Sequence, residues 1–233
     1  MQTSEYVGIC TWSLWFFGFF TDGYLSFICH FLGAYYSFIT VHDASHGNAS
    51  LFFGRFSSIP LLIPFDEFRK LHQLHHANVN DEHRDPDYTM HQISPLCWFF
   101  APEVYVLYYV REASHLSKGR CAIMLGLLRY LFFIVLVVGS SILFGLKWSM
   151  MHLLFPSRCA FALLVYLLDY LPHDGFGAWG RNNCARNMWN GQAPWWLVLA
   201  TQNQCYHSLH HEQPHIPTLS LHDNSKRPTA KDS

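Results

Sequence analysis

Two segments of the chain carry the same histidine pattern, HxxHH, and a third carries HxxxH. The segments are HQLHH at residues 72–76, HSLHH at 207–211 and HDASH at 42–46. Histidines three and four residues apart lie on one face of an α-helix, so each segment would present its rings together. The third segment follows directly on a long apolar run at residues 24–40. We therefore expect its two rings at the end of a membrane-buried helix.

Four apolar stretches are candidates to cross a membrane, at residues 7–20, 24–40, 130–146 and 158–171. Each is short against the ~20 residues that a helix needs to cross a hydrocarbon core of ~30 Å, so flanking residues must complete it. Charged residues make up only 13% of the chain, whereas a typical soluble domain carries about 25%. The sequence therefore predicts an all-α, multi-pass membrane protein with about four transmembrane helices.

Lysine and arginine are concentrated in two parts of the chain, between the second and third stretches and after the fourth. Four crossings place both parts on one side, which the positive charge marks as cytoplasmic or its equivalent. All three histidine patterns fall on that side, as does His173 at the end of the fourth stretch. We expect residues 1–222 to form a single membrane domain and residues 223–233 to form a solvated tail.

Nine histidines can meet at this place. They are His42, His46, His72, His75, His76, His173, His207, His210 and His211. A structural zinc site closes with four ligands, usually including cysteine, so nine are too many for one ion. Two ions with four to five ligands each match the number. Imidazole suits zinc, copper, iron and nickel, but helix-borne rings in a membrane setting, with no thiolate pattern among the seven cysteines, favour two irons.

Other polar residues are not expected to bind the metals directly. Four acidic residues near the patterns are candidates to orient the rings: Asp43, Asp81, Asp169 and Glu212. The remaining histidines are expected not to bind metal: His30, His83, His91, His115, His152, His215 and His222. His30 falls in the middle of an apolar stretch, and we expect it to be buried with its hydrogen bonds made inside the protein.

The set HxxxH, HxxHH and HxxHH resembles the membrane fatty-acid desaturase and hydroxylase superfamily, over residues 24–217. Longer segments are similar to the cyanobacterial-type beta-carotene hydroxylases: HQLHHANVNDEHRDPDY (72–88), DYLPH (169–173) and QNQCYHSLHHEQPHIP (202–217). HDASHG (42–47) is shared by these hydroxylases and the carotenoid ketolases. In this group the YLPH histidine, here His173, joins the two HxxHH patterns around the metals. The chain departs from the group in its shorter length and in Thr218, where members often carry tryptophan.

The resemblance implies an O₂-dependent, non-haem di-iron monooxygenase that hydroxylates a carotenoid, at the 3-position of the ionone ring of beta-carotene. The chain has no Rossmann glycine motif, haem-attachment motif or iron–sulfur cysteine pattern, so electrons would come from an external donor. The resemblance suggests a ferredoxin. The substrate would be a lipid-soluble molecule dissolved in the bilayer.

Other functions stay open at this point. A fatty-acid or lipid desaturase, or a carotenoid ketolase, of the same superfamily would carry the same patterns. A metal transporter fits less well, because its ligands belong near the membrane midplane rather than at span ends. The net charge of −1 provides no basic field for nucleic acid. The membrane could be a bacterial inner membrane, a plastid or thylakoid membrane, or the endoplasmic reticulum.

Overall fold

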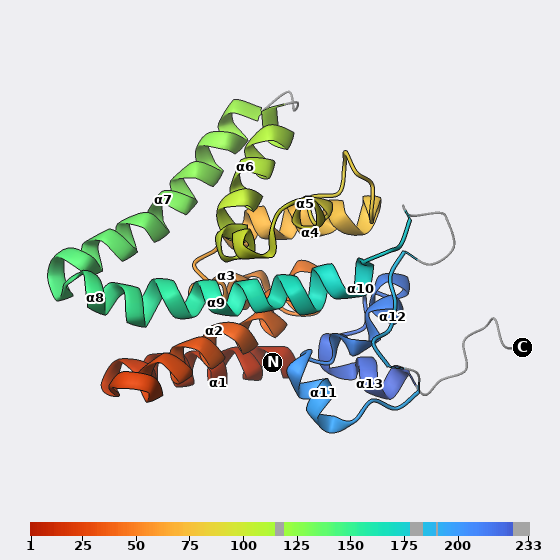
Figure 1. The fold of residues 1–233 in the computed structure, drawn as a ribbon, viewed down its shortest axis with the longest axis horizontal. Coiled ribbons are helices and arrows are strands. Elements are labelled where there is room, and N and C mark those ends of the chain that lie inside the picture. Colours follow the sequence, from red (N-terminus) through yellow and green to blue (C-terminus); the bar gives the residue numbers. More distant parts are fainter. Residues whose placement is uncertain (115–118, 178–183, 190, 226–233) are drawn as a thin grey trace, which may run out of the picture.

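Two long helical hairpins organise the fold (Figure 1). The computed structural model describes residues 1–114, 119–177, 184–189 and 191–225, and every regular element in them is helical. The first hairpin pairs α1 (Thr3–Phe17) with α2 (Gly23–Ser45) through the short 3₁₀ helix η1 (Gly18–Phe20). The second joins α7 (Gly119–Phe144) through a turn to a continuous helical segment from Leu146 to His173, and the two diverge from that turn, near which they are in contact. The predicted all-α class is confirmed.

The remaining elements are short. The segment that returns from α7 contains α8 (Leu146–Ser149), the π-helical η3 (Met150–Leu154), α9 (Phe155–Leu164), the π-helical η4 (Val165–Tyr170) and α10 (Leu171–His173). Between the hairpins lie α3 (Leu51–Ser57), α4 (Phe65–Asn78), α5 (Tyr88–Gln92), η2 (Pro95–Phe100) and α6 (Ala101–Ser114). After them come α11 (Trp195–Ala200), η5 (Gln204–Tyr206), α12 (His207–Glu212), η6 (Thr218–Ser220) and α13 (Leu221–Asn224).

Three helical segments in the described residues are long and apolar enough to cross a membrane: Gly23–Ser45, Gly119–Phe144 and Leu146–His173. With 15 residues, α1 is shorter, and it packs along α2 as a fourth apolar helix. The three candidate spans together with α1 are roughly consistent with the predicted number of about four transmembrane helices. The expected start of the third span at residue 130 is wrong, because α7 begins eleven residues earlier, at Gly119. Arg129 belongs to this helix and reaches Glu67 of α4, with 2.6 Å between Nη1 and Oε1.

The expected start of the last span at Arg158 is also wrong. The helical segment begins at Leu146, and Arg158 lies near its middle, with only 4% of its surface exposed. Its guanidinium forms an ion pair with Glu103 of α6, and the Tyr130 hydroxyl donates to the same carboxylate oxygen over 2.6 Å. A charge inside an apolar helix is expensive unless it has a partner. Here the partner comes from a different helix.

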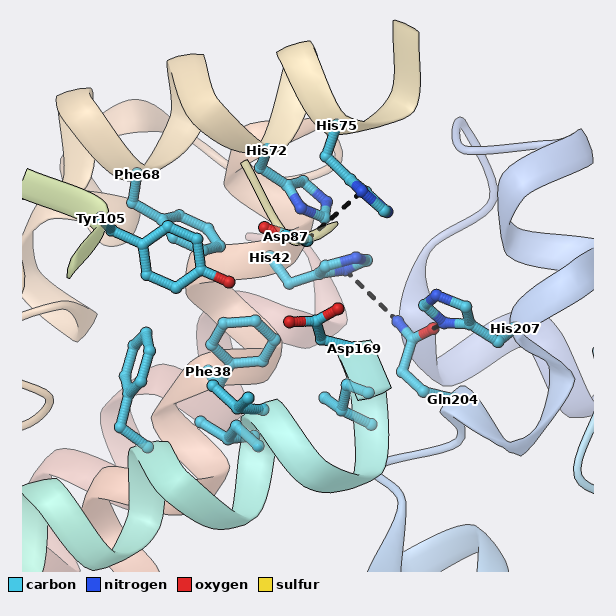
Figure 2. A pocket seen from close by; sticks show the side chains of 14 residues that line it. Phe38, His42, Phe68, His72, His75, Asp87, Tyr105, Asp169, Gln204 and His207 are labelled. Carbon is cyan, nitrogen blue, oxygen red and sulfur yellow. Dashed lines mark hydrogen bonds and ion pairs between the residues drawn. The ribbon is translucent and has the colours of Figure 1, made fainter. Parts of the chain in front are cut away.

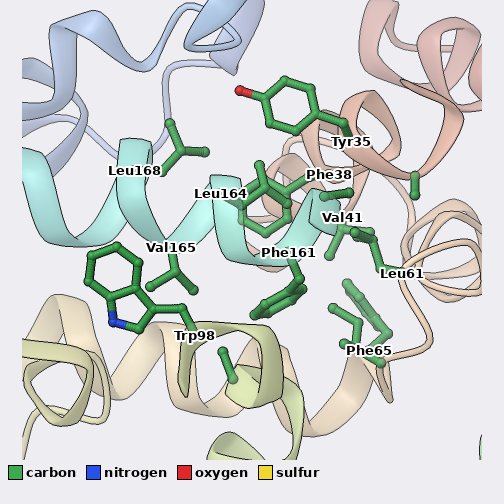
Figure 3. Close-up of a cluster of buried hydrophobic side chains, with 14 of the residues drawn as sticks. Tyr35, Phe38, Val41, Leu61, Phe65, Trp98, Phe161, Leu164, Val165 and Leu168 are labelled. Atoms are coloured by element: carbon green, nitrogen blue, oxygen red, sulfur yellow. The ribbon is translucent and has the colours of Figure 1, made fainter. Parts of the chain in front are cut away.

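The two hairpins meet in a common core (Figure 3). Phe38 and Val41 of α2 face Phe161 and Leu164 of α9, and Leu61 closes the cluster from the connection after α3. Packing of α2 against α9 fixes the C-terminal ends of two apolar helices side by side. These are the ends that carry HDASH and His173.

The first hairpin depends on a close approach at Gly33. A Cβ atom on Gly33 would lie 2.6 Å from the Cβ atom of Trp15 on α1, which is closer than any real contact. Small residues allow helix backbones to pack this tightly in membrane proteins.

Replacing Gly33 with leucine is expected to push α1 away from α2 and to destabilise the protein by about 1–3 kcal/mol, the usual effect of overpacking. Thermal unfolding of the detergent-solubilised protein would measure it. The matched control is Gly139→Leu, since a Cβ atom on Gly139 meets nothing within 4 Å. Equal destabilisation by the two substitutions would contradict the packing argument.

A short helix, α13, lies at the domain boundary expected from the sequence. Helix α13 spans residues 221–224, and its first residue, Leu221, is fully buried. The expected boundary at residue 222 therefore falls inside this helix. The rest of the expected tail, residues 226–233, lies outside the described residues.

Candidate metal centre

The nine histidines singled out in the sequence come from four helices and gather at one place. Two lie at the end of α2, three in α4, one at the end of α10 and three in α12: His42, His46, His72, His75, His76, His173, His207, His210 and His211. Six of the nine are buried, and His46, His72 and His76 are half-buried. No other described histidine joins them in a group able to hold a metal ion.

A first group contains His42, His46, His72 and His210, whose ring nitrogens all lie within 4.8 Å of one another. The Nε2 atoms of His42 and His210 are 3.2 Å apart, and those of His46 and His72 are 2.8 Å apart. The helical spacing explains the two pairs of neighbours: His42 and His46 are one turn apart on α2 and face the first residue of the HxxHH pattern on α4.

A second group contains His75, His173, His207 and His211. Here the Nε2 atom of His207 lies 3.0 Å from those of both His173 and His211, and His75 lies 3.4 Å from His211. The ninth ring, His76, sits between the groups. Its Nε2 atom is 3.0 Å from that of His210, and its ring centroid is 4.4 Å from that of His211.

These distances are close to those of metal coordination. Nitrogen ligands about 2.1 Å from an ion lie roughly 3.0–3.4 Å from each other; the spacings given above fall in this range except that of His46 and His72, which at 2.8 Å is slightly shorter. Metal binding also needs neutral rings. Burial, reinforced by the neighbouring histidines, lowers the pKa well below the ordinary value for the rings outside the apolar spans: His72, His76, His207, His210 and His211. The arrangement suits two ions with four to five imidazoles each.

Groups behind the rings hold two of them from the Nδ1 side. Asp85 accepts from His75 Nδ1 over 2.9 Å. Although burial opposes the charged ring, the carboxylates of Asp85 and Asp87 raise the pKa of His75 to about 9, so this ring must release a proton when a metal binds. A carboxylate in this position fixes the proton on Nδ1 and directs Nε2 to the metal. For His173, the backbone carbonyl of Cys184 plays the same part over 2.9 Å.

Two further rings are held by residues close to α12. Thr218 lies 3.0 Å from His42 Nδ1, and its hydroxyl donates to Asp43 over 2.6 Å. Gln204 Oε1 accepts from His207 Nδ1 over 3.2 Å. Thr218, the residue at which the chain departs from the carotenoid hydroxylases, is thus part of the centre here.

Of the four acidic residues proposed from the sequence, Asp43 alone is linked to a ring of the centre, through Thr218. Asp81 instead caps backbone N–H groups of the following turn, and Glu212 is exposed. Asp169 lines a pocket beside the rings. The most direct partner, Asp85, was missed. Its signal is the sequence Asp-Pro-Asp at 85–87, ten residues after His75, where a turn brings a carboxylate back toward α4.

The chain as a whole matches one protein family. The sequence model of the fatty acid desaturase family matches residues 13–232, which is nearly the whole chain. The chain belongs to the fatty acid desaturase family. Neither the search of curated proteins nor the search of solved structures gave a significant match. The superfamily expected from the histidine patterns is therefore confirmed: this is a membrane oxidoreductase of the desaturase and hydroxylase type, a family that typically uses two irons.

A pocket in this desaturase-family protein leads to the histidines (Figure 2). His42, His72, His75 and His207 form its inner face, and its walls are mainly apolar side chains from four helical segments: Phe38, Phe68, Phe161, Leu164, Val165 and Leu168. The pocket has a volume of about 50 Å³, below the range of about 300–1,000 Å³ for small-molecule sites. Its mainly apolar lining suits an apolar molecule, but side chains must move before a ring or a chain can enter.

Replacing Asp85 with asparagine is expected to weaken metal binding by about 10- to 100-fold, the usual effect of removing a carboxylate behind a histidine ligand. The amide keeps the shape but cannot accept the Nδ1 proton as a charged group. Iron content measured across a titration of free Fe²⁺ would show the change. Asp81→Asn is the control, because Asp81 contacts only backbone N–H groups. An unchanged affinity in Asp85→Asn would contradict the assignment.

Proposed function

We propose that this desaturase-family protein hydroxylates a carotenoid, at the 3-position of the ionone ring of beta-carotene, with O₂ and electrons from an external donor such as ferredoxin. The observation that carries the proposal is the apolar pocket ending on both histidine groups. The carotenoid is supported by the segments 72–88, 169–173 and 202–217, which resemble carotenoid hydroxylases over much more than the histidines.

Two iron ions are the proposed cofactors, and they would supply the activation of O₂ that an unactivated C–H bond requires. His42, His46, His72 and His210, with His76, would hold one ion, and His75, His173, His207 and His211 the other. Asp85, Thr218, Gln204 and the Cys184 carbonyl keep four of these rings in the binding orientation.

The pocket walls provide the remaining requirements. Phe38, Phe68 and Phe161 offer an incoming ring apolar contacts, so shape and dispersion contacts would hold the substrate. Polar groups of the pocket, among them Asp87 and Asp169, lie close to the rings. The three phenylalanines exclude water from the place where the oxidant forms, which protects it from side reactions.

The membrane arrangement is part of the proposal. Four apolar helices would cross the bilayer, with residues 1–222 as one domain and the histidine groups on the cytoplasmic side, following the lysine and arginine distribution. The substrate would then reach the pocket from within the bilayer, and a soluble donor would approach from the opposite direction.

A second candidate is desaturation of a fatty-acid or other lipid chain, which the family match favours. The mainly apolar lining of the pocket suits an acyl chain as well as a ring. Desaturation and hydroxylation begin with the same removal of a hydrogen atom. They differ in the second step, which either adds a hydroxyl group or removes a second hydrogen atom, so the histidine geometry is common to both. Ketolation of a carotenoid ring belongs to the same chemistry.

Mass spectrometry of pigment and lipid extracts distinguishes these reactions. The host is a bacterium that accumulates beta-carotene and expresses the protein, and the control is the double variant His75→Ala, His210→Ala. Carotene that gains hydroxyl oxygen only with intact histidines is the expected result. A keto product would assign the protein to ketolation. Unchanged carotene together with a new acyl double bond would assign it to lipid desaturation.

A further inference from the structure

Asp169 is a buried carboxyl group that the metal centre does not use. It is 7% exposed, and among the described residues neither of its carboxylate oxygens has a hydrogen-bond partner. Leaving such a group unsatisfied costs about 1–3 kcal/mol. Asp169 also lies in η4, a π-helical stretch, and such stretches occur frequently at functional sites. Two independent features therefore mark this carboxyl as functional.

The position of Asp169 is next to the reaction site. Its carboxylate points into the pocket whose inner face is formed by His42, His72, His75 and His207 (Figure 2). It lies one turn before His173 in the chain. Asp87, the other carboxyl in the pocket, already lies 3.5 Å from His75 Nδ1. Asp169 thus combines access to the pocket with a carboxylate that holds no ring of the centre, and the Tyr105 hydroxyl is a neighbour of both Asp169 and Asp87.

His91 lies between Asp169 and the protein surface. Its Nε2 atom lies 3.6 Å from Oδ1 of Asp169, and its side chain is 15% exposed, compared with 9% for Asp169. The His91 ring is held in place by stacking on Tyr170, at 4.9 Å between centroids, and on Tyr88. Hydrogen bonds between catalytic groups are often long before substrate binds, so a small rotation of the ring completes this contact.

The chemistry of the family requires protons at this place. Hydroxylation follows RH + O₂ + 2e⁻ + 2H⁺ → ROH + H₂O, in which the donor supplies the two electrons. Desaturation consumes the same two electrons and two protons and releases two waters. The histidines of the centre cannot supply these protons while their Nε2 atoms hold metal. An apolar pocket that excludes water offers no solvent path either.

We propose that His91 and Asp169 form a proton relay from the protein surface to the site of O₂ reduction. Protonated Asp169 gives its proton to the oxygen that leaves as water and is reprotonated by His91. His91 then takes a proton from solvent at its exposed edge, and the relay runs twice in each turnover. The proposal rests on the O₂ chemistry proposed above and holds equally for hydroxylation and for desaturation.

Proton uptake without an organic substrate tests the relay. Purified protein is loaded with Fe²⁺, reduced with dithionite, freed of excess reductant and mixed with O₂ in a stopped-flow instrument. Without substrate, the two electrons of the reduced centre take O₂ to hydrogen peroxide, O₂ + 2e⁻ + 2H⁺ → H₂O₂, so the two protons that the relay delivers to reduced oxygen are still taken up. A pH-indicator dye reports proton uptake, and O₂ consumption is recorded separately. The variants Asp169→Asn and His91→Phe are expected to keep their iron. Their rate of proton uptake should fall by roughly 100-fold or more, since a general acid typically contributes about 100- to 10,000-fold. Asp169→Glu is expected to restore much of the rate.

The control is Asp22→Asn, an exposed residue at the opposite end of α2, which is expected to behave as the wild type. Normal proton uptake in Asp169→Asn, with O₂ consumed by the wild type, would overturn the relay alone. Loss of iron from both relay variants would also overturn it, because Asp169 and His91 would then support the centre structurally. A wild-type protein that binds iron and consumes no O₂ would overturn the proposed function and the relay together.

Discussion

Replacing His210 with alanine is expected to abolish product formation and to weaken iron binding in the first histidine group by more than about 100-fold. Removing a residue that only hydrogen-bonds a metal ligand already weakens binding by about 10- to 100-fold, and His210 would be a ligand itself. His210 is fully buried. Its Nε2 atom lies 3.2 Å from that of His42 and 3.0 Å from that of His76. The substitution removes the nitrogen at which these two rings meet. Iron per protein molecule and extracted product are the two measurements.

A buried histidine elsewhere in the fold provides the matched control. His30 is equally buried, but it lies far from the centre on α2, where its Nε2 atom is 3.0 Å from Nδ1 of His152. The expectation of a buried, internally hydrogen-bonded ring is met at Nε2, whereas Nδ1 has no hydrogen-bond partner among the described residues. His30→Ala is expected to retain iron. Equal iron loss from both variants would show that burial, rather than metal ligation, explains the effect of replacing His210.

Replacing Glu103 with leucine is expected to destabilise the protein by about 3–5 kcal/mol, because it leaves the Arg158 charge buried without a partner. Arg158 lies near the middle of an apolar helix, where neither end is close enough for its side chain to reach water. The unfolding transition of the detergent-solubilised protein would measure the loss.

The double variant Glu103→Leu, Arg158→Met separates pairing from packing. It removes both charges, and we expect it to recover most of the stability that the single variant loses. Glu112→Leu serves as the exposed control, since Glu112 pairs with its neighbour Arg111 at the surface, where such pairs contribute about 0–1 kcal/mol. A double variant no more stable than Glu103→Leu would contradict the assignment of the loss to the unpaired charge.

The histidine positions could be predicted because the signal is local. Spacings of three and four residues define a helix face wherever the helix lies, so HxxHH indicates a group of rings before anything is known of the fold. How the four helices share their rings could not be predicted in the same way. His76 lies between the two groups, next to both His210 and His211, and this depends on how α4 and α12 meet in the fold.

The residues behind the rings depend on irregular backbone and were harder to predict. Gln204 enters the centre only because the chain passes through two consecutive left-handed residues, Gln202 with φ 52° and Asn203 with φ 68°. Asp85 reaches His75 through the turn that follows α4. Neither conformation has a periodic pattern in the sequence.

The span boundaries failed for a different reason. Predicting them from the sequence assumes that a charged residue marks the end of an apolar helix, which holds when the charge must reach water. Arg129 and Arg158 instead find carboxylates on α4 and α6. An ion pair between distant segments can therefore keep a charged residue inside a long apolar helix. The sequence alone suggests that such a helix ends at the charged residue.

The ligands of the centre lie far apart along the chain, with His42 and His210 separated by 168 positions. During synthesis, α2 and α4 emerge long before α12, so the centre cannot exist until α12 has been made. Metal loading is accordingly a late step of maturation. Once bound, the ions act as a reversible crosslink between the first hairpin and the C-terminal segment. Removal of iron by a chelator should release that segment and speed protease cleavage near α12. The fraction of the protein that resists cleavage would then measure how much of it has bound metal.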